Sequence, residues 1–150
     1  MKGLSDFSLS FFRELIRRIP WLESRSVIDP HPEVDEGSLL IDFSPPPIRE
    51  HSQFWVSTNE GEVTVGFGMF HMHFEWPCPS DQEFWEDPVD FILDLVEERV
   101  LIEDWTKNGK WSGSSILKRG EQPDTSEMDE DNKIHIRSWT GVFDRTILCK

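Results

Sequence analysis

Short turn-forming segments between runs of alternating apolar residues constrain this chain more than any other feature. Asn108-Gly109 separates Val100–Thr106 from Lys110–Leu117, and Asn59-Glu60-Gly61 follows an earlier apolar run. Asn-Gly favours the positive φ angles of a two-residue hairpin turn. Such turns join antiparallel strands, because parallel strands need a long crossover connection. The sequence therefore predicts a fold dominated by antiparallel sheet.

The segment Ser52–Trp76 is predicted to form one long hairpin. With a two-residue loop at Glu60-Gly61, Trp55 faces Gly66, a pairing in which an aromatic ring covers a strand glycine. The apolar alternation changes phase beyond this pair. A β-bulge over Gly66-Phe67-Gly68 would keep the second arm continuous, since glycine inside a strand often marks a bulge.

Two segments have the apolar spacing of amphipathic helices. Phe7–Ile19 has Ser8 or Ser10 as candidate N-caps and is followed by Pro20. Its predicted apolar stripe consists of Leu9, Phe12, Leu15, Ile16 and Ile19. The second helix, Glu86–Glu98, has Asp87 as candidate N-cap and Pro88 in its first turn. Its predicted solvent face consists of Asp90, Asp94, Glu97 and Glu98.

Three further strands are predicted at Ser38–Phe43, Lys133–Trp139 and Val142–Leu148. The predicted class is α+β: a single globular domain over residues 1–150, with about seven mainly antiparallel strands built from hairpins and two helices packed on them. The polar segment near 120–132 is predicted to be an acidic mobile loop within that domain.

Negative charge dominates the composition. The chain has 29 acidic and 15 basic residues, a formal net charge of −14. Such a chain is repelled by nucleic acids and anionic membranes, and it attracts a basic partner. It shows no signal peptide or apolar span, and Cys78 and Cys149 have no metal or redox spacing. We therefore expect a cytoplasmic protein; its oligomeric state is not predicted.

No enzyme motif is present, and no cofactor is expected. The chain lacks a Gly-x-Ser-x-Gly elbow, a phosphate loop and a dinucleotide fingerprint. Glu103 and Asp104 are adjacent in a predicted strand and therefore point to opposite faces. The one candidate metal set is His71, His73 and Glu75, which share a strand face and would suit a metal-dependent hydrolase. The alternative is that these histidines occupy the polar face of an amphipathic strand.

The acidic face of the second helix is the candidate partner-binding surface. Asp90, Asp94 and Glu97 lie on one side of the helix, where like charges cost stability unless a cation neutralises them. Glu86 and Asp87 extend this charge, and an exposed Trp85 would serve as an anchor. The alternative is an ordinary solvated helix face, because acidic residues also suit a helix N-terminus.

Three stretches resemble those of small bacterial immunity proteins that accompany polymorphic or contact-dependent toxins. They are Glu62–Phe67 running into His71–Phe74, Lys110–Ser115, and Arg137–Arg145. The resemblance implies a small acidic cytosolic protein, not an enzyme, that neutralises a cognate toxin domain by direct binding. The negative charge of the chain predicts that this toxin domain is basic. It transfers no site residues. The alternative function remains a metal-dependent hydrolase using His71, His73 and Glu75.

Overall fold

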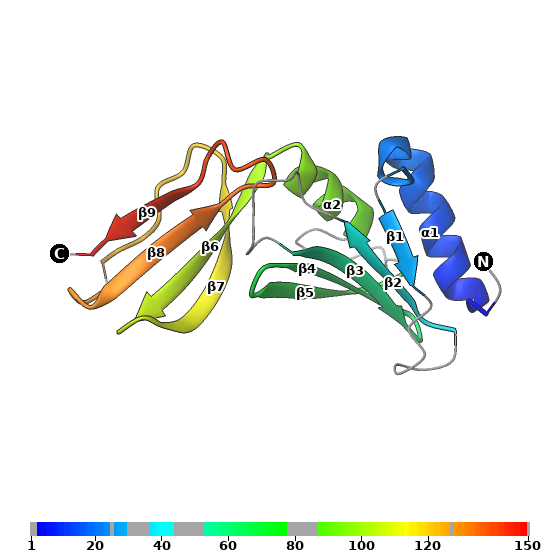
Figure 1. Ribbon diagram of the computed structural model, residues 1–150, viewed down its shortest axis with the longest axis horizontal. Coiled ribbons are helices and arrows are strands. Elements are labelled where there is room, and N and C mark those ends of the chain that lie inside the picture. The colour runs from blue at the N-terminus through cyan, green and yellow to red at the C-terminus, as the bar shows by residue number, and fades with distance from the viewer. Residues whose placement is uncertain are drawn as a thin grey trace. The chain divides into compact units, whose positions relative to one another are not determined.

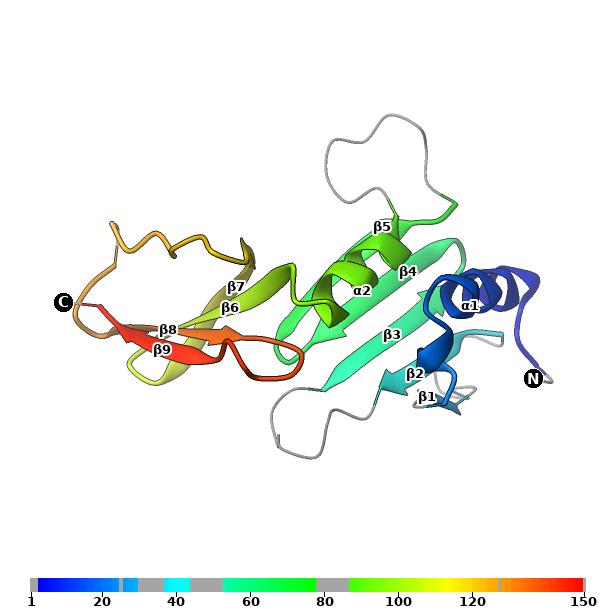
Figure 2. The same cartoon turned by 90° about the horizontal axis from the view of Figure 1, so that it is seen from above.

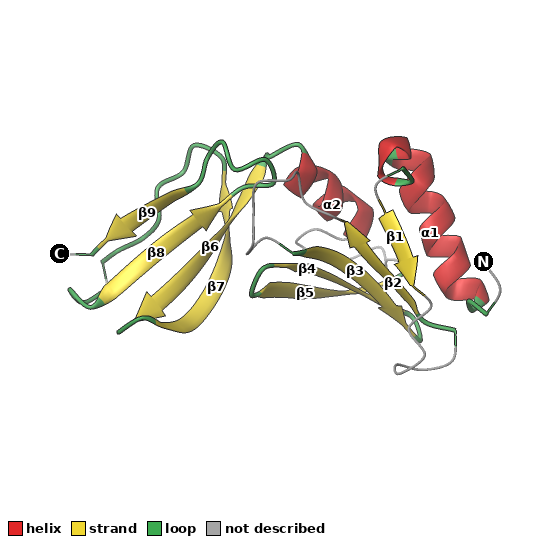
Figure 3. Cartoon of the chain, viewed as in Figure 1, coloured by secondary structure: helices red, strands yellow, loops and turns green. Residues whose placement is uncertain are grey.

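The computed structural model describes residues 3–24, 26–29, 37–43, 53–77, 87–126 and 128–149 (Figure 1). The chain forms two compact units, Met1–Leu93 and Asp94–Lys150, and each is described by itself. The α+β class with antiparallel pairing is confirmed (Figure 3). The single domain over residues 1–150 stays a prediction.

The first unit begins with α1 (Asp6–Arg18) and continues into a five-stranded antiparallel meander, whose spatial order follows the chain. Its strands are β1 (Ser26–Asp29), β2 (Leu39–Phe43), β3 (Phe54–Asn59), β4 (Glu62–Phe67) and β5 (Phe70–Glu75). A short 3₁₀ helix, Pro20–Leu22, follows α1. The sheet is followed by α2 (Pro88–Val96), whose residues up to Leu93 belong to the first unit.

The N-cap of α1 is Ser5, whose hydroxyl accepts a hydrogen bond from Ser8 N at 3.1 Å. Ser8, which we predicted as a cap, is instead buried, because its hydroxyl donates to Gly37 O at 2.8 Å and lies 2.7 Å from Thr58 Oγ1. The buried stripe is therefore rotated from the predicted one. It consists of Ser8, Phe11, Phe12, Leu15 and Ile19, with Leu9 and Ile16 only partly buried.

Both helices cover the same face of the first sheet (Figure 2). Phe91 of α2 packs against Phe70 and Phe74, at ring-centre distances of 6.0 and 5.5 Å. Phe43 and Phe54 stack at 4.7 Å within the same layer. Each such ring contributes about 1.5–3 kcal/mol through burial, so this layer fixes which side of the sheet faces the helices.

The predicted hairpin Ser52–Trp76 is wrong in its second arm. Trp55 faces Gly66 as predicted, but Gly68 and Met69 reverse the chain after Phe67. The change in apolar phase reflects this reversal and not a bulge. Gly68 has φ +61°, which suits a tight turn.

The second unit contains a four-stranded antiparallel sheet in the order β7-β6-β8-β9. Its strands are β6 (Val100–Lys107), β7 (Lys110–Lys118), β8 (Asn132–Arg137) and β9 (Arg145–Leu148). Asn108 and Gly109 have positive φ angles of 52° and 73°, as the predicted hairpin turn requires. The described residues thus contain nine strands in two sheets, not about seven in one. β6 pairs with β7 on one edge and with β8 on the other.

Apolar residues on one side of the second sheet form its core. They are Leu101, Leu117, Ile134, Ile136 and Cys149, with Trp105, Met128, Phe143 and Ile147 packed against them. Met128 and Asp129 belong to the predicted mobile loop, and Asp129 pairs with Lys107 at 2.7 Å. The described residues of 120–131 form no helix or strand, and their mobility stays a prediction.

Glu98 does not belong to the solvent face of α2, contrary to our prediction. It follows the helix at φ +56° and is buried. Its carboxylate accepts hydrogen bonds from Thr140 N at 2.6 Å and Thr140 Oγ1 at 2.7 Å. The side chain therefore orders the loop before β9, and charge pattern alone did not indicate this role.

Candidate functional site

The predicted acidic surface of α2 is already supplied with cations. Trp85 and Glu86 lie outside the described residues. Arg18 of α1 forms ion pairs with Asp87, at 3.4 Å, and with Asp90. Asp87 also caps the helix as predicted, because its Oδ1 accepts a hydrogen bond from Val89 N at 2.7 Å.

Asp94 and Glu97, the other two described carboxylates of the predicted surface, contact a second arginine. Arg99 donates hydrogen bonds to both. Four carboxylates of this surface therefore contact two arginines. Its role in partner binding stays a prediction, but the like-charge repulsion on which that prediction depended is largely relieved.

The three predicted metal ligands do not form a joint centre. His71, His73 and Glu75 lie on the exposed side of β5, as their alternation predicts. Within the described residues, however, no three His, Cys, Asp or Glu side chains are grouped closely enough to hold a metal. The hydrolase alternative therefore lacks its three-ligand centre in this part of the chain.

These residues belong to a larger surface, which we call the open face: the side of β2–β5 that points away from the helices. The strand register arranges its side chains in rows across the sheet. The first row is Asp42, Trp55, Gly66 and His71; the second is Leu40, Ser57, Thr64 and His73; the third is Asn59, Glu62 and Glu75. Residues far apart in the sequence thus meet on one surface.

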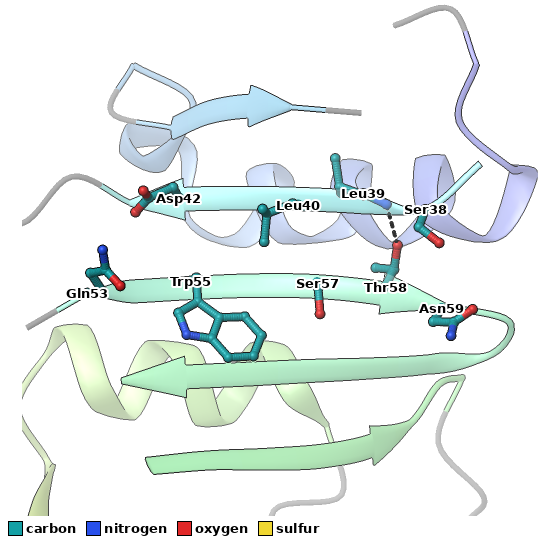
Figure 4. A pocket seen from close by; sticks show the side chains of 9 residues that line it. All are labelled: Ser38, Leu39, Leu40, Asp42, Gln53, Trp55, Ser57, Thr58 and Asn59. Carbon is teal, nitrogen blue, oxygen red and sulfur yellow. Dashed lines mark hydrogen bonds between the residues drawn. The ribbon is translucent and has the colours of Figure 1, made fainter. Parts of the chain in front are cut away.

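Trp55 lies at the centre of the open face. Its indole covers Gly66 on the neighbouring strand, where a side chain would overlap the ring. A hollow of about 380 Å³ lies beside the ring over β2 and β3 (Figure 4). Its lining includes Ser38, Leu40, Asp42, Gln53, Ser57 and Asn59. An aromatic surface with acid and amide groups around it suits a ligand that has both apolar and cationic or hydrogen-bonding parts.

Charge on the open face has one sign. The rows contain three carboxylates, Asp42, Glu62 and Glu75, and β2 to β5 contain no lysine or arginine. The nearest groups able to take a positive charge in these strands are His71 and His73. Asp42 and Glu62 form no ion pair with a lysine or arginine of the described residues, whereas the carboxylates of α2 contact Arg18 and Arg99.

His73 is hydrogen-bonded in a cluster on this face. Its Nδ1 lies 2.8 Å from Glu62 Oε1 and 3.0 Å from Thr64 Oγ1. The three residue types could suggest a nucleophile, base and acid. In a catalytic triad, however, the hydroxyl and the carboxylate bind opposite nitrogens of the imidazole. Here both meet Nδ1, so the cluster does not activate the Thr64 hydroxyl.

Besides Glu98, the second unit contains two buried carboxylates on β6, Glu103 and Asp104. Asp104 accepts hydrogen bonds from Arg137 at 2.9 Å and from Ser114. Glu103 points to the opposite face, as predicted, and accepts a hydrogen bond from Ser115 at 2.7 Å, while its Oε2 has no partner among the described residues. Because they face opposite sides of the strand, they form no acid–base pair.

Comparison of the chain with protein-family models, with curated protein sequences and with solved structures finds no match. Among the described residues, no helix is both long and apolar enough to cross a membrane. The resemblance to immunity proteins therefore remains an expectation from sequence.

The open face was missed as a unit from sequence alone, although its parts were visible. The Trp55–Gly66 pairing was predicted, and it fixes the β3–β4 register. The missing signal was the turn at Gly68 and Met69. Counting residues from that turn along β4 and β5 places Thr64 opposite His73, with Glu62 next to them.

Proposed function

We propose that this chain is a small acidic binding protein that neutralises a basic protein toxin in the cytoplasm, and that the open face is its contact surface. The observation that carries the proposal is the single sign of charge there. Asp42, Glu62 and Glu75 lie in rows around Trp55, and the strands contain no lysine or arginine. A basic surface would meet complementary charge at Asp42 and Glu62, which form no ion pair with a lysine or arginine of the described residues.

The distribution of charge along the chain supports this location. Residues 1–93 contain 17 acidic and 6 basic residues, a net charge of −11. Residues 94–150 contain 12 acidic and 9 basic residues, a net charge of −3. The first unit, which contains the open face, therefore attracts a cationic partner most strongly and accelerates its association at low salt.

Trp55 is the proposed anchor of the interface. Tryptophan is enriched among the residues that carry most of the binding energy, especially near the centre of a contact surface. The indole is partly exposed, and covering Gly66 holds it against the sheet. A lysine or arginine side chain of the partner placed over this ring would also approach Asp42, the cross-strand neighbour of Trp55.

Inhibition would follow from occlusion. If the partner is a nuclease or another enzyme with a basic active site, carboxylates of the open face would occupy the positions of substrate phosphates. The α2 carboxylates Asp87, Asp90, Asp94 and Glu97 are the alternative contact surface. Their existing ion pairs with Arg18 and Arg99 make that surface the weaker candidate.

The test is a binding titration with the toxin domain encoded beside this gene. We expect a 1:1 complex whose affinity falls as salt concentration rises, together with loss of the toxin's activity when the complex forms. A basic toxin domain that remains active in the presence of excess folded chain, with no heat of binding, would contradict the proposal.

A further inference from the structure

His71 and His73 are spaced for a shared ion. They lie two residues apart on the exposed side of β5, so both rings project from the same face. Their ring centres are 5.3 Å apart. With metal–nitrogen distances of about 2.0–2.1 Å, two imidazoles bound to one ion at a near-tetrahedral angle have centres about 5 Å apart. The observed separation meets that requirement without movement of the strand.

The hydrogen bonds of His73 determine which of its nitrogens is available. Glu62 Oε1 lies 2.8 Å from Nδ1, and the Thr64 hydroxyl donates to the same oxygen at 3.3 Å. An ionised carboxylate only accepts hydrogen bonds, so Nδ1 carries the hydrogen. In the neutral ring, Nε2 is then the nitrogen with the lone pair.

This arrangement is the one found around metal-binding histidines. There, the second ring nitrogen usually donates to a carboxylate, which fixes the tautomer and makes the other nitrogen more basic. The side chains of His73 and Glu62 are 55% and 50% exposed, so an ion reaches them from solvent. His71 makes no hydrogen bond to another described residue, and its ring contacts His73.

We propose that His71 and His73 form a two-histidine site for a divalent transition-metal ion, with Glu62 holding His73 in the metal-binding tautomer and water completing the coordination. Imidazole ligands favour Cu²⁺, Ni²⁺ and Zn²⁺ over Mg²⁺ and Ca²⁺, with Cu²⁺ bound most tightly. The site differs from the hydrolase centre predicted from sequence, because Glu75 is not a ligand. The site lies on the open face and shares Glu62 with the proposed contact surface, but metal binding there requires no partner protein.

The experiment is a calorimetric titration of the purified chain with Cu²⁺ alone. We expect His71→Asn and His73→Asn each to weaken binding at least tenfold. Glu62→Gln should weaken it by about tenfold, the lower end of the effect of removing such a carboxylate. His135→Asn is the matched control, because His135 lies in the second sheet and contacts Thr146 at 3.1 Å. The affinity of this variant for Cu²⁺ should match that of the unaltered chain. Circular dichroism checks that each variant is folded.

Trp55 provides a local readout of where the ion binds. Trp55 and His71 are the two cross-strand neighbours of Gly66, so Cu²⁺ held by the histidines lies close enough to quench the indole. We expect Cu²⁺ to quench part of the fluorescence, and that part to be missing in Trp55→Phe. Undiminished affinity in the folded His71→Asn/His73→Asn double variant, or equal quenching in Trp55→Phe, would overturn the proposal. No partner protein is present, so this result is separate from the test of toxin binding.

Discussion

The acidic residues of α2 and those of the open face differ in their surroundings more than in their number. On α2, Asp87 and Asp90 contact Arg18, while Asp94 and Glu97 contact Arg99. On the open face, Asp42 and Glu62 form no ion pair with a lysine or arginine of the described residues, and strands β2 to β5 contain neither residue type. A run of acidic residues in the sequence therefore does not by itself locate a binding surface, because the fold can place arginines beside those residues.

The largest effect is expected from Trp55→Ala. If the open face is the contact surface, removing its central aromatic residue should weaken binding to the toxin domain by at least 2 kcal/mol, about 30-fold. Trp111→Ala is the matched control, since Trp111 is 49% exposed but lies in the second sheet. Calorimetry on both variants measures the difference. Equal losses would remove the distinction between the two regions.

Gly66→Val tests whether the glycine is required by the indole above it. A side chain at this position would overlap the Trp55 ring. We expect the free energy of unfolding to fall by about 1–3 kcal/mol in urea titrations, because the ring must leave its position. Ser57→Val, on the same face, should change stability by less than about 0.5 kcal/mol. A stable Gly66→Val variant with an unchanged indole environment would refute the packing argument.

Arg18→Gln tests the α2 surface by removing the arginine that contacts Asp87 and Asp90. The ion pairs of Arg18 with Asp87 and Asp90 are partly exposed, so we expect a loss of about 0.2–1 kcal/mol in unfolding free energy. Affinity for the toxin domain should stay within about threefold, a difference under about 1 kcal/mol. A clear rise in affinity would show that the released α2 carboxylates join the contact surface.

The smallest effect concerns an exposed ion pair of the second unit. The hydrogen bond from Lys107 lowers the pKa of the Asp129 carboxyl. A carboxyl with a lowered pKa stabilises the fold above its unfolded pKa, and this contribution is lost as pH falls through the folded pKa. Lys107→Gln should therefore raise the Asp129 pKa in an NMR titration. The stability difference from the unaltered chain should appear at neutral pH and vanish in acid. An unchanged pKa would contradict the pairing.

The features that the sequence predicted correctly depend on interactions between residues close together in the chain. The Asn108-Gly109 turn, the Trp55–Gly66 pairing and the Asp87 cap follow from interactions within one turn or one hairpin. The phase change after Phe67 was misread because a bulge and a tight turn both alter the alternation. β1 was missed because only four residues form it, and its pairing with β2 is a tertiary contact.

The candidate site depended on contacts that sequence spacing does not reveal. Arg18 and Asp90 are 72 residues apart in the chain, so the neutralisation of the acidic helix appears only when α1 and α2 are placed on the sheet. Likewise, Asp42 and His71 share a row only through the register of three successive strand pairs. Side-chain alternation placed His71 and His73 on the polar side, but not Glu62 beside His73.

The most direct test compares two variants that each remove two negative charges. Asp42→Asn/Glu62→Gln alters the open face, and Asp90→Asn/Glu97→Gln alters α2. Affinities for the toxin domain are measured across a range of salt concentrations with EDTA present. We predict that the open-face variant loses at least tenfold in affinity and has a weaker salt dependence, while the α2 variant stays within about threefold, less than about 1 kcal/mol. Equal losses, or a larger loss from the α2 variant, would contradict the open face as the contact surface.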